Sequence, residues 1–292
     1  YELVAKQNNS YALMNLGSIY FNGLGVKTDY LKAKYYFELA SKQNIPEAFY
    51  NLGKIYFNGY GIPKDNLRAI KYFELASKDK FSDSLITLGN IYYYGNGVNK
   101  NYSKSLKYFE LAAEQNNSCA IYNLGVMYYY RFGVEQDYLK AKHYFESSAK
   151  LNNSEALLRL GYIYEKGNGI EKNYLKAITC YELSAKQNNS EALFYLGSIY
   201  SNNSKFLDLS KAKEYLLKCY KIRSQQIINV SSNHVSSTIN TKYNFYRYRS
   251  VNDLGLIYIT CDQDPKKASE YIKESAFGEY PYGQNNFGLL NQ

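Results

Sequence analysis

Glycine recurs at the same place every 36 residues along most of this chain. It lies within the sequence Leu-Gly-x-x-Tyr each time, at Gly17, Gly53, Gly89, Gly125, Gly161 and Gly197. A fixed period of roughly 20 to 50 residues is typical of repeat arrays, in which each unit packs against its neighbours along the chain. We therefore expect the 292 residues to form one elongated stack of repeats rather than two globular domains.

Each repeat contains two segments whose apolar residues follow the spacing of an amphipathic helix. In the second repeat these segments cover residues 48–56 and 67–76. Paired glycines such as Gly59 and Gly61 should end the first helix, because a left-handed turn needs a residue without a Cβ. An Asp or Asn N-cap such as Asp65 should start the second helix. The sequence thus predicts a helical hairpin in every repeat.

Two positions in the first helix need a specific explanation. Its start is expected to be capped by a serine hydroxyl, at Ser10, Ser118, Ser154 and Ser190. The glycine inside the helix costs about 1 kcal/mol relative to alanine. We expect each of these glycines to allow close approach of a neighbouring helix, with small residues such as Ala69 and Ala76 on the opposing surface.

The repeat pattern also identifies a family. Residues 12–200 follow Ala-x-x-x-Leu-Gly-x-x-Tyr-x-x-Gly-x-Gly-Val-x-x-Asp-x-x-x-Ala-x-x-Tyr-Phe-x-x-Ala-Ala. This pattern resembles the Sel-one-like repeat family, a subclass of the tetratricopeptide-type hairpins. The double-glycine loop distinguishes it from the plain tetratricopeptide repeat of about 34 residues. The resemblance implies an all-α fold, a right-handed α-α superhelix (solenoid) of 36-residue helical hairpins.

Departures from the pattern define the expected organisation of this single α-solenoid over residues 1–292. Repeat six has Asn203 where the loop glycine should stand, and because asparagine tolerates left-handed geometry we expect its turn to survive. We expect a truncated preceding repeat (second helix only) at 1–11, six repeats at 12–223, an insertion at 224–242, a degenerate seventh repeat at 243–281 and part of an eighth at 282–292. Incomplete terminal repeats suggest a piece of a longer polypeptide.

Composition argues against several classes of function. The net charge is +9, but Lys and Arg are scattered over every repeat, which argues against dedicated nucleic-acid binding. His143, expected to face solvent, and His234, in the insertion, have no partner placed to form a catalytic dyad. The four cysteines show neither disulfide nor zinc spacing, at Cys119, Cys180, Cys219 and Cys261. We expect no catalytic residue, no metal, no cofactor and no enzymatic activity.

The chain also lacks an apolar run of the roughly 20 residues that span a bilayer, so no membrane span is expected. A soluble chain in the cytoplasm is slightly favoured. The sequons of the form Asn-x-Ser/Thr keep a lumenal location open, because in a lumenal protein they would be glycan acceptors.

Positions of the first helix that packing does not require form ladders from repeat to repeat. One reads Asn15, Asn51, Thr87, Asn123, Arg159, Tyr195; a second reads Met14, Tyr50, Ile86, Tyr122, Leu158, Phe194; a third begins Phe21, Phe57, Tyr93, Tyr129. Asparagine amides can bond an extended backbone, and flanking rings add apolar contact. The expected concave groove therefore contains Asn15, Asn51, Asn123, Arg159, Tyr50, Tyr122, Phe21, Phe57, Tyr93 and Tyr129. For the third ladder, packing between repeats is the competing and favoured explanation.

These observations favour a non-enzymatic scaffold or adaptor that binds a protein or peptide segment in the groove. An alternative makes the repeats the targeting region of a larger enzyme, a kinase or a ubiquitin-ligase component, whose catalytic domain lies outside these residues. A third hypothesis, nucleic-acid binding through the +9 surface, predicts a steep loss of affinity with salt.

Overall fold

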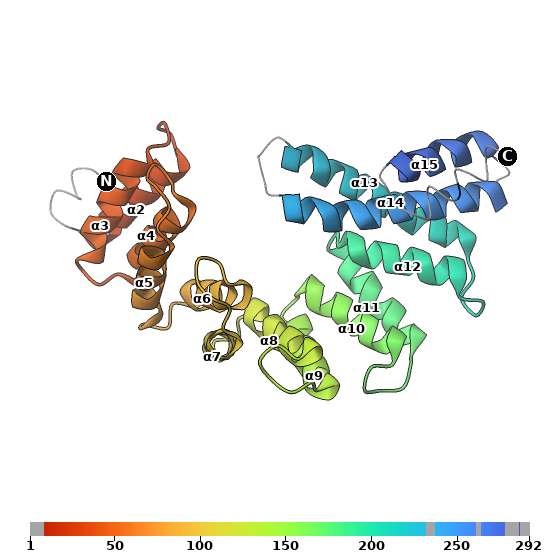
Figure 1. The fold of residues 1–292 in the computed structure, drawn as a ribbon, viewed down its shortest axis with the longest axis horizontal. Helices are drawn as coiled ribbons and strands as arrows, with labels where there is room; N and C mark the ends of the chain where they lie inside the picture. Colours follow the sequence, from red (N-terminus) through yellow and green to blue (C-terminus); the bar gives the residue numbers. More distant parts are fainter. Residues whose placement is uncertain (1–8, 232–236, 261–263, 278–285, 287–292) are drawn as a thin grey trace. The chain divides into compact units, whose positions relative to one another are not determined.

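The structure is a computed structural model of the 292 residues. It describes all of them except 1–8, 232–236, 261–263, 278–285 and 287–292 (Figure 1). The described residues form fourteen helices, α2 to α15, and contain no strand. Within each of the two units described below, successive helices pack as hairpins, and each hairpin also packs on the next. The predicted all-α fold of helical hairpins is confirmed.

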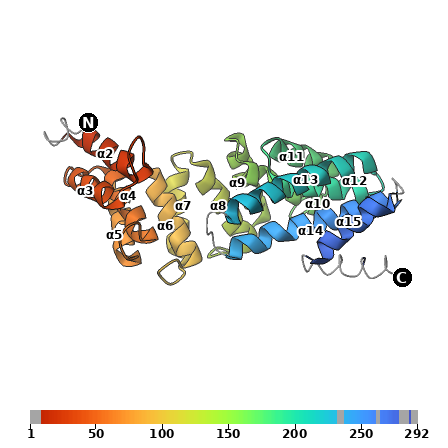
Figure 2. The ribbon, with the colours of Figure 1, turned by 90° about the horizontal axis from the view of Figure 1, so that it is seen from above.

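The chain divides into two compact units, and the first is Tyr1–Asn152. Its described part contains four hairpins (Figures 1 and 2). Their helices are α2 (Ser10–Asn22), α3 (Tyr30–Ser41), α4 (Pro46–Asn58), α5 (Asn66–Ser77), α6 (Ser82–Tyr94), α7 (Tyr102–Ala113), α8 (Ser118–Tyr130) and α9 (Tyr138–Lys150).

The second unit is Asn153–Gln292. Its helices are α10 (Ser154–Lys166), α11 (Tyr174–Lys186), α12 (Ser190–Asn202), α13 (Leu209–Ser231), α14 (Ser237–Thr260) and α15 (Pro265–Phe277). Helices α13 and α14, with 23 and 24 residues, are much longer than the others and lie side by side (Figure 1). Most of the residues expected as an insertion, 224–242, therefore belong to these two helices. Residues 1–8 and most of the partial repeat expected at 282–292 lie outside the described residues.

The helix starts differ from the sequence prediction. In α8 the cap is Asn117, whose Oδ1 accepts from the backbone N–H of Ala120 at 3.1 Å, and Ser118 is already the first helical residue. The same holds at the starts of α2, α10 and α12, where the caps are Asn9, Asn153 and Asn189. The expectation of serine caps was wrong by one residue, because asparagine is an equally good N-cap and stands at the last extended position.

The interior glycines do allow close approach, but the opposing group differs from the prediction. A Cβ on Gly53 would lie 2.5 Å from the ring of Phe73, which belongs to the second helix of the same hairpin. The same contact recurs in the other hairpins of the first unit, between Gly17 and Phe37, Gly89 and Phe109, and Gly125 and Phe145. In the first unit a buried aromatic ring, rather than a small residue, therefore fills the space that each of these glycines leaves, whereas Leu216 fills it at Gly197.

The loop turns keep their left-handed residue in most repeats. Gly59 has φ 72°, and Arg131 adopts φ 62° at the equivalent position of repeat four. In repeat six, Asn203 is extended, with φ −98° and ψ 112°, so the expected left-handed turn does not survive there. That loop is one residue shorter than the others, which removes the need for a tight reversal at this position.

Candidate functional site

The asparagine ladder occupies equivalent positions on α2, α4 and α8 of the first unit. Asn15, Asn51 and Asn123 are each half-buried, and each directly precedes a buried leucine that packs into the core. The Nδ2 of Asn51 donates to the backbone carbonyl of Glu47 at 3.0 Å. This bond orients the amide, so that Oδ1 is the atom placed to accept a hydrogen bond from a partner.

A cavity lies beside the first asparagine of the ladder. Its volume is about 350 Å³, and it is lined by Met14, Asn15 and Ser18 from α2 and by Ile45 and Glu47 at the start of α4. An amide, a hydroxyl and a carboxylate therefore line a space that also has apolar walls. Pockets with a few polar groups on an apolar wall are the usual form of a binding site.

Two tyrosines of the second ladder stand next to the asparagines. The Tyr50 ring lies 5.6 Å from Phe73 and 5.4 Å from Phe81, and the Tyr122 ring lies 5.7 Å from Phe145. Burial raises the pKa of Tyr50 above its ordinary value, and a hydrogen bond with Thr87 partly offsets the rise. Both rings are half-buried, so packing holds them in place while part of each ring remains exposed.

The rings of the third ladder are engaged in packing. Phe21 makes edge contacts with Tyr30 at 5.4 Å and with Tyr60, from the loop of the next hairpin, at 5.3 Å. Tyr93, two hairpins further along the chain, makes the equivalent contacts with Tyr102 at 5.6 Å and Phe132 at 5.4 Å between ring centroids. The remaining two rings of this ladder also pack on neighbouring rings, at Phe57 and Tyr129. These contacts favour the packing explanation for the third ladder.

In the second unit the ladder positions of α12 are covered by the chain itself. The ring of Tyr246, on the lengthened α14, lies 5.4 Å from Phe194 and 6.3 Å from Tyr195 on α12. The Tyr246 hydroxyl donates to Oε1 of the buried Glu191 at 2.7 Å. Burial, and then the nearby carboxylate of Glu191, raise the pKa of Tyr246. Burial raises the pKa of Tyr195, and the positive charge of Arg159 on α10 offsets a small part of this rise. Arg159 itself is half-buried.

The described residues contain no group of three or more His, Cys, Asp or Glu that could hold a metal ion. His143 is exposed on α9, as expected, and His234 lies outside the described residues. Among the described helices none combines the length and the apolar character needed to cross a membrane.

Sequence reasoning missed a second recurring arrangement. A lysine or arginine from the first turn of the following helix lies over the tyrosine ring of Leu-Gly-x-x-Tyr. In α7, Nζ of Lys104 lies 4.8 Å from the ring centroid of Tyr92. The same contact recurs for Lys32 and Tyr20, Arg68 and Tyr56, Lys140 and Tyr128, Lys176 and Tyr164, Lys211 and Tyr200, and Lys267 and Tyr258. The fixed spacing of 12 residues in the first pairs was the available signal.

Solved structures share this architecture. One is the crystal structure of c5321, a protective antigen of uropathogenic Escherichia coli strains displaying an SLR fold, with 28% identity and a TM-score of 0.77. The match covers 97% of this chain and 57% of the antigen, so the chain spans little more than half of that protein's length. A Sel1 repeat protein from Oxalobacter formigenes has 31% identity and a TM-score of 0.68, over 73% of this chain and 88% of its own. No curated protein matches the chain.

The sequence also matches the Sel1 repeat model six times, over residues 10–45, 46–80, 82–117, 120–153, 154–189 and 190–218. These matches cover more than half of the chain and coincide with the hairpins from α2 to α13. The sequence pattern and the packing of each glycine on its hairpin partner thus have one explanation, which is that the chain belongs to the Sel1 repeat family.

Proposed function

We propose that this chain is a non-enzymatic interaction scaffold that binds an extended segment of a partner protein along α2, α4, α6 and α8. Sel1 repeats are generally protein–protein interaction repeats, which supports the general class of function. The proposed surface consists of Asn15, Asn51 and Asn123 with the rings of Tyr50 and Tyr122. The rings of the third ladder contribute by fixing each hairpin against the next.

This proposal depends on one observation. The side-chain amides of Asn15, Asn51 and Asn123 are half-exposed at the same position of three hairpins in the first unit. An extended peptide presents backbone N–H and C=O groups, which asparagine amides can bond whatever the peptide's side chains are. Rings beside the amides add apolar contact at a small cost in conformational entropy. Apolar residues would serve better at these positions if packing were their only role.

We restrict the proposed surface to the first unit, because Tyr246 covers the ladder residues of α12 in the second unit. In the second unit, Tyr246 lies against Phe194 and Tyr195, which are the ladder residues of α12. A partner segment that used these positions would first have to displace Tyr246 from Glu191. Arg159, on α10 of the second unit, is proposed as a separate contact outside this surface.

The test uses peptides selected from a random library against the whole chain. Their affinities are then measured by calorimetry for the natural chain and for a variant with Asn15, Asn51 and Asn123 replaced by alanine. Each lost hydrogen bond is worth about 0.5–1.5 kcal/mol, so we expect the triple variant to bind at least tenfold more weakly.

The matched control replaces three other asparagines by alanine, namely Asn22, Asn58 and Asn202. Each is exposed at the end of a helix and donates only to a carbonyl or hydroxyl of its own last turns. We expect this control to bind as the natural chain does. Equal affinities for the two triple variants, with unchanged helicity, would remove the ladder as the binding surface.

A further inference from the structure

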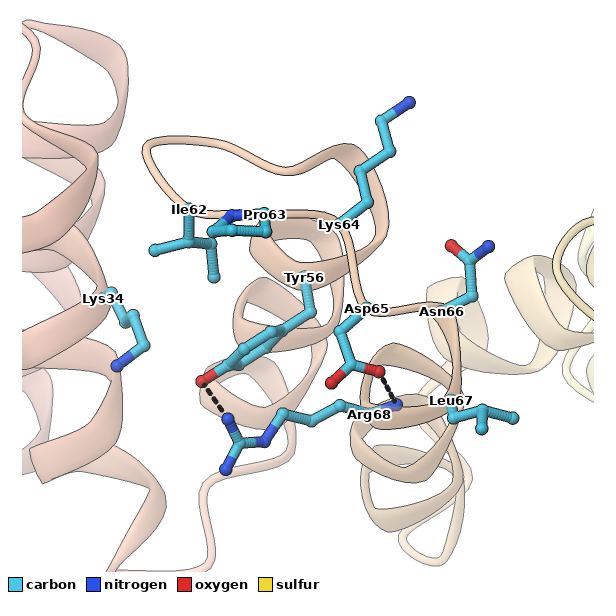
Figure 3. A pocket seen from close by; sticks show the side chains of 9 residues that line it. All are labelled: Lys34, Tyr56, Ile62, Pro63, Lys64, Asp65, Asn66, Leu67 and Arg68. Carbon is cyan, nitrogen blue, oxygen red and sulfur yellow. Dashed lines mark hydrogen bonds between the residues drawn. The ribbon is translucent and has the colours of Figure 1, made fainter.

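A cleft of about 610 Å³ lies between α3 and the α4–α5 hairpin, and Asn51 is not among the residues that line it (Figure 3). Lys34 reaches into it from α3 and Arg68 from α5, and both point toward the hydroxyl of Tyr56. Nη1 of Arg68 donates to this hydroxyl at 3.1 Å, and Nζ of Lys34 lies 6.0 Å from the ring centroid of Tyr56. Two cations from different helices thus converge on one phenol oxygen.

Only some repeats place two cations beside the tyrosine, as Lys34 and Arg68 do at Tyr56. The residue equivalent to Lys34 is Ile70 in the next repeat and Leu106 in the one after, so Tyr92 and Tyr128 each have one such cation. In the second unit the pair recurs at Tyr258, where Lys213 lies 4.2 Å and Lys267 lies 5.5 Å from the ring centroid. Tyr92 stacks on Tyr108 and Tyr128 stacks on Tyr144 all the same, so this stacking between the two helices of a hairpin does not require the second cation.

We infer that the cleft at Tyr56 binds the carboxylate of an acidic residue in an extended segment of a partner protein. The guanidinium of Arg68 and the ammonium of Lys34 would each donate to the carboxylate, and the Tyr56 hydroxyl would supply a third donor. This inference does not rest on the asparagine ladder, because no residue is shared between the two surfaces.

The charges around the cleft favour a carboxylate over a phosphate group. Lys34 and Arg68 contribute two positive charges beside Tyr56, and Glu38 and Asp65 contribute two negative ones, while the ammonium of Lys64 points away from Tyr56 (Figure 3). Asp65 accepts from the backbone N–H of Arg68 at 2.9 Å, and Glu38 pairs with Lys34 at 2.6 Å. One carboxylate adds a single negative charge to this balanced set, whereas a phosphate group would add about −1.5 to −2 at neutral pH, so the charges favour the carboxylate.

Exposed leucines beside the cleft indicate that the acidic residue belongs to a peptide. Leu67 lies at the edge of the cleft and is 73% exposed. Leu31, 60% exposed, lines the equivalent cleft of the preceding repeat, whose volume is about 550 Å³. A segment that alternates acidic and apolar residues could place a carboxylate in the cleft at Tyr56 and apolar side chains on these leucines.

Fluorescence anisotropy with a dye-labelled (Glu-Leu)4 peptide tests the inference on the whole chain. The variants are Lys34→Ile, which copies the residue of the next repeat, and the conservative Arg68→Gln. The control is Lys107→Ile, which removes the same charge from an exposed position of α7. We expect each cleft variant to weaken binding about tenfold, as loss of a charge-assisted hydrogen bond implies, and the control to stay within about twofold.

Two further arms identify the ligand. A (Gln-Leu)4 peptide should bind as weakly to the natural chain as the acidic peptide binds to Arg68→Gln, and the triple Asn→Ala ladder variant should bind (Glu-Leu)4 normally. Equal binding of (Glu-Leu)4 by Arg68→Gln and by Lys107→Ile would overturn the inference, as would no binding by the natural chain. Displacement of the peptide by inorganic phosphate at concentrations where acetate has no effect would also overturn it, by assigning the cleft to phosphate.

Discussion

Two consecutive asparagines join several hairpins, and their backbones differ. In the junction between α7 and α8, Asn116 has φ 56°, whereas Asn117 is extended and caps α8. The first asparagine therefore reverses the chain after one helix, and the second satisfies backbone donors at the start of the next. One residue type serves both purposes because its short amide tolerates left-handed geometry and also accepts a hydrogen bond.

The position of the cap can be tested where α10 begins. Oδ1 of Asn153 accepts from the backbone N–H of Ala156 at 3.0 Å. We expect Asn153→Ala to lower the free energy of unfolding by about 1 kcal/mol, and Ser154→Ala to change it by less than about 0.5 kcal/mol. Urea denaturation compares the two variants. A larger effect for the serine variant would restore the serine cap that the sequence suggested.

A second test concerns the glycine inside α4. A Cβ at Gly53 would lie 2.5 Å from the Phe73 ring, which is 1% exposed. Overpacking of this kind costs about 1–3 kcal/mol and should outweigh the gain in helix propensity of about 1 kcal/mol. We expect Gly53→Ala to destabilise the chain in urea denaturation, with the exposed Asn58→Ala as the control. A Gly53→Ala chain as stable as the natural one would contradict the close-packing explanation.

At the scale of the helices, a stacked tyrosine pair connects the two members of most hairpins. Tyr92 on α6 and Tyr108 on α7 have ring centroids 5.9 Å apart and planes within 6°. Equivalent pairs are Tyr20 and Tyr36, Tyr56 and Tyr72, Tyr128 and Tyr144, Tyr200 and Tyr215, and Tyr258 and Tyr271. The 36 tyrosines of this chain are thus partly explained by one contact made in most hairpins.

These pairs predict a loss of stability in alkali. Burial, and then the charge of Glu74 and the neighbouring Tyr92, raise the pKa of Tyr108 from 10.0 to about 12. The folded chain therefore holds this proton more tightly, so its contribution to stability is complete below about pH 10 and is lost as the pH rises toward 12. Urea unfolding between about pH 8 and 11 should show this decline, and Tyr108→Phe should make it shallower. The exposed Tyr94→Phe is the control; if it reduces the decline equally, Tyr108 is not responsible.

At the scale of the molecule, the period predicted the hairpins and the positions of Asn15 and Asn51 because both depend on local sequence. The cover of α12 by Tyr246 was not predictable, because it joins residues 55 apart through an insertion that breaks the period. The role of the third ladder was also ambiguous in sequence. Only the structure shows that Phe21 contacts Tyr60, in a loop of the following repeat.

Contacts between successive helices also predict how far a local defect spreads. Within each unit the main contacts join neighbouring helices, so stability is expected to be approximately a sum over repeats and their neighbours. In Gly53→Ala, hydrogen exchange should therefore lose protection in α3–α6 and stay unchanged in α12–α14. A uniform loss of protection over all helices would show instead that the chain unfolds as one cooperative block.

The most direct test of the proposed function observes the asparagine side chains during binding. In ¹H–¹⁵N spectra of the chain, titration with a library-selected peptide should shift the side-chain NH₂ signals of Asn15, Asn51 and Asn123. The NH₂ signals of Asn22 and Asn58, which lie at the ends of α2 and α4, should not move. Shifts at Asn22 and Asn58 with none at Asn15, Asn51 and Asn123 would contradict the claim that the ladder is the surface that binds a partner.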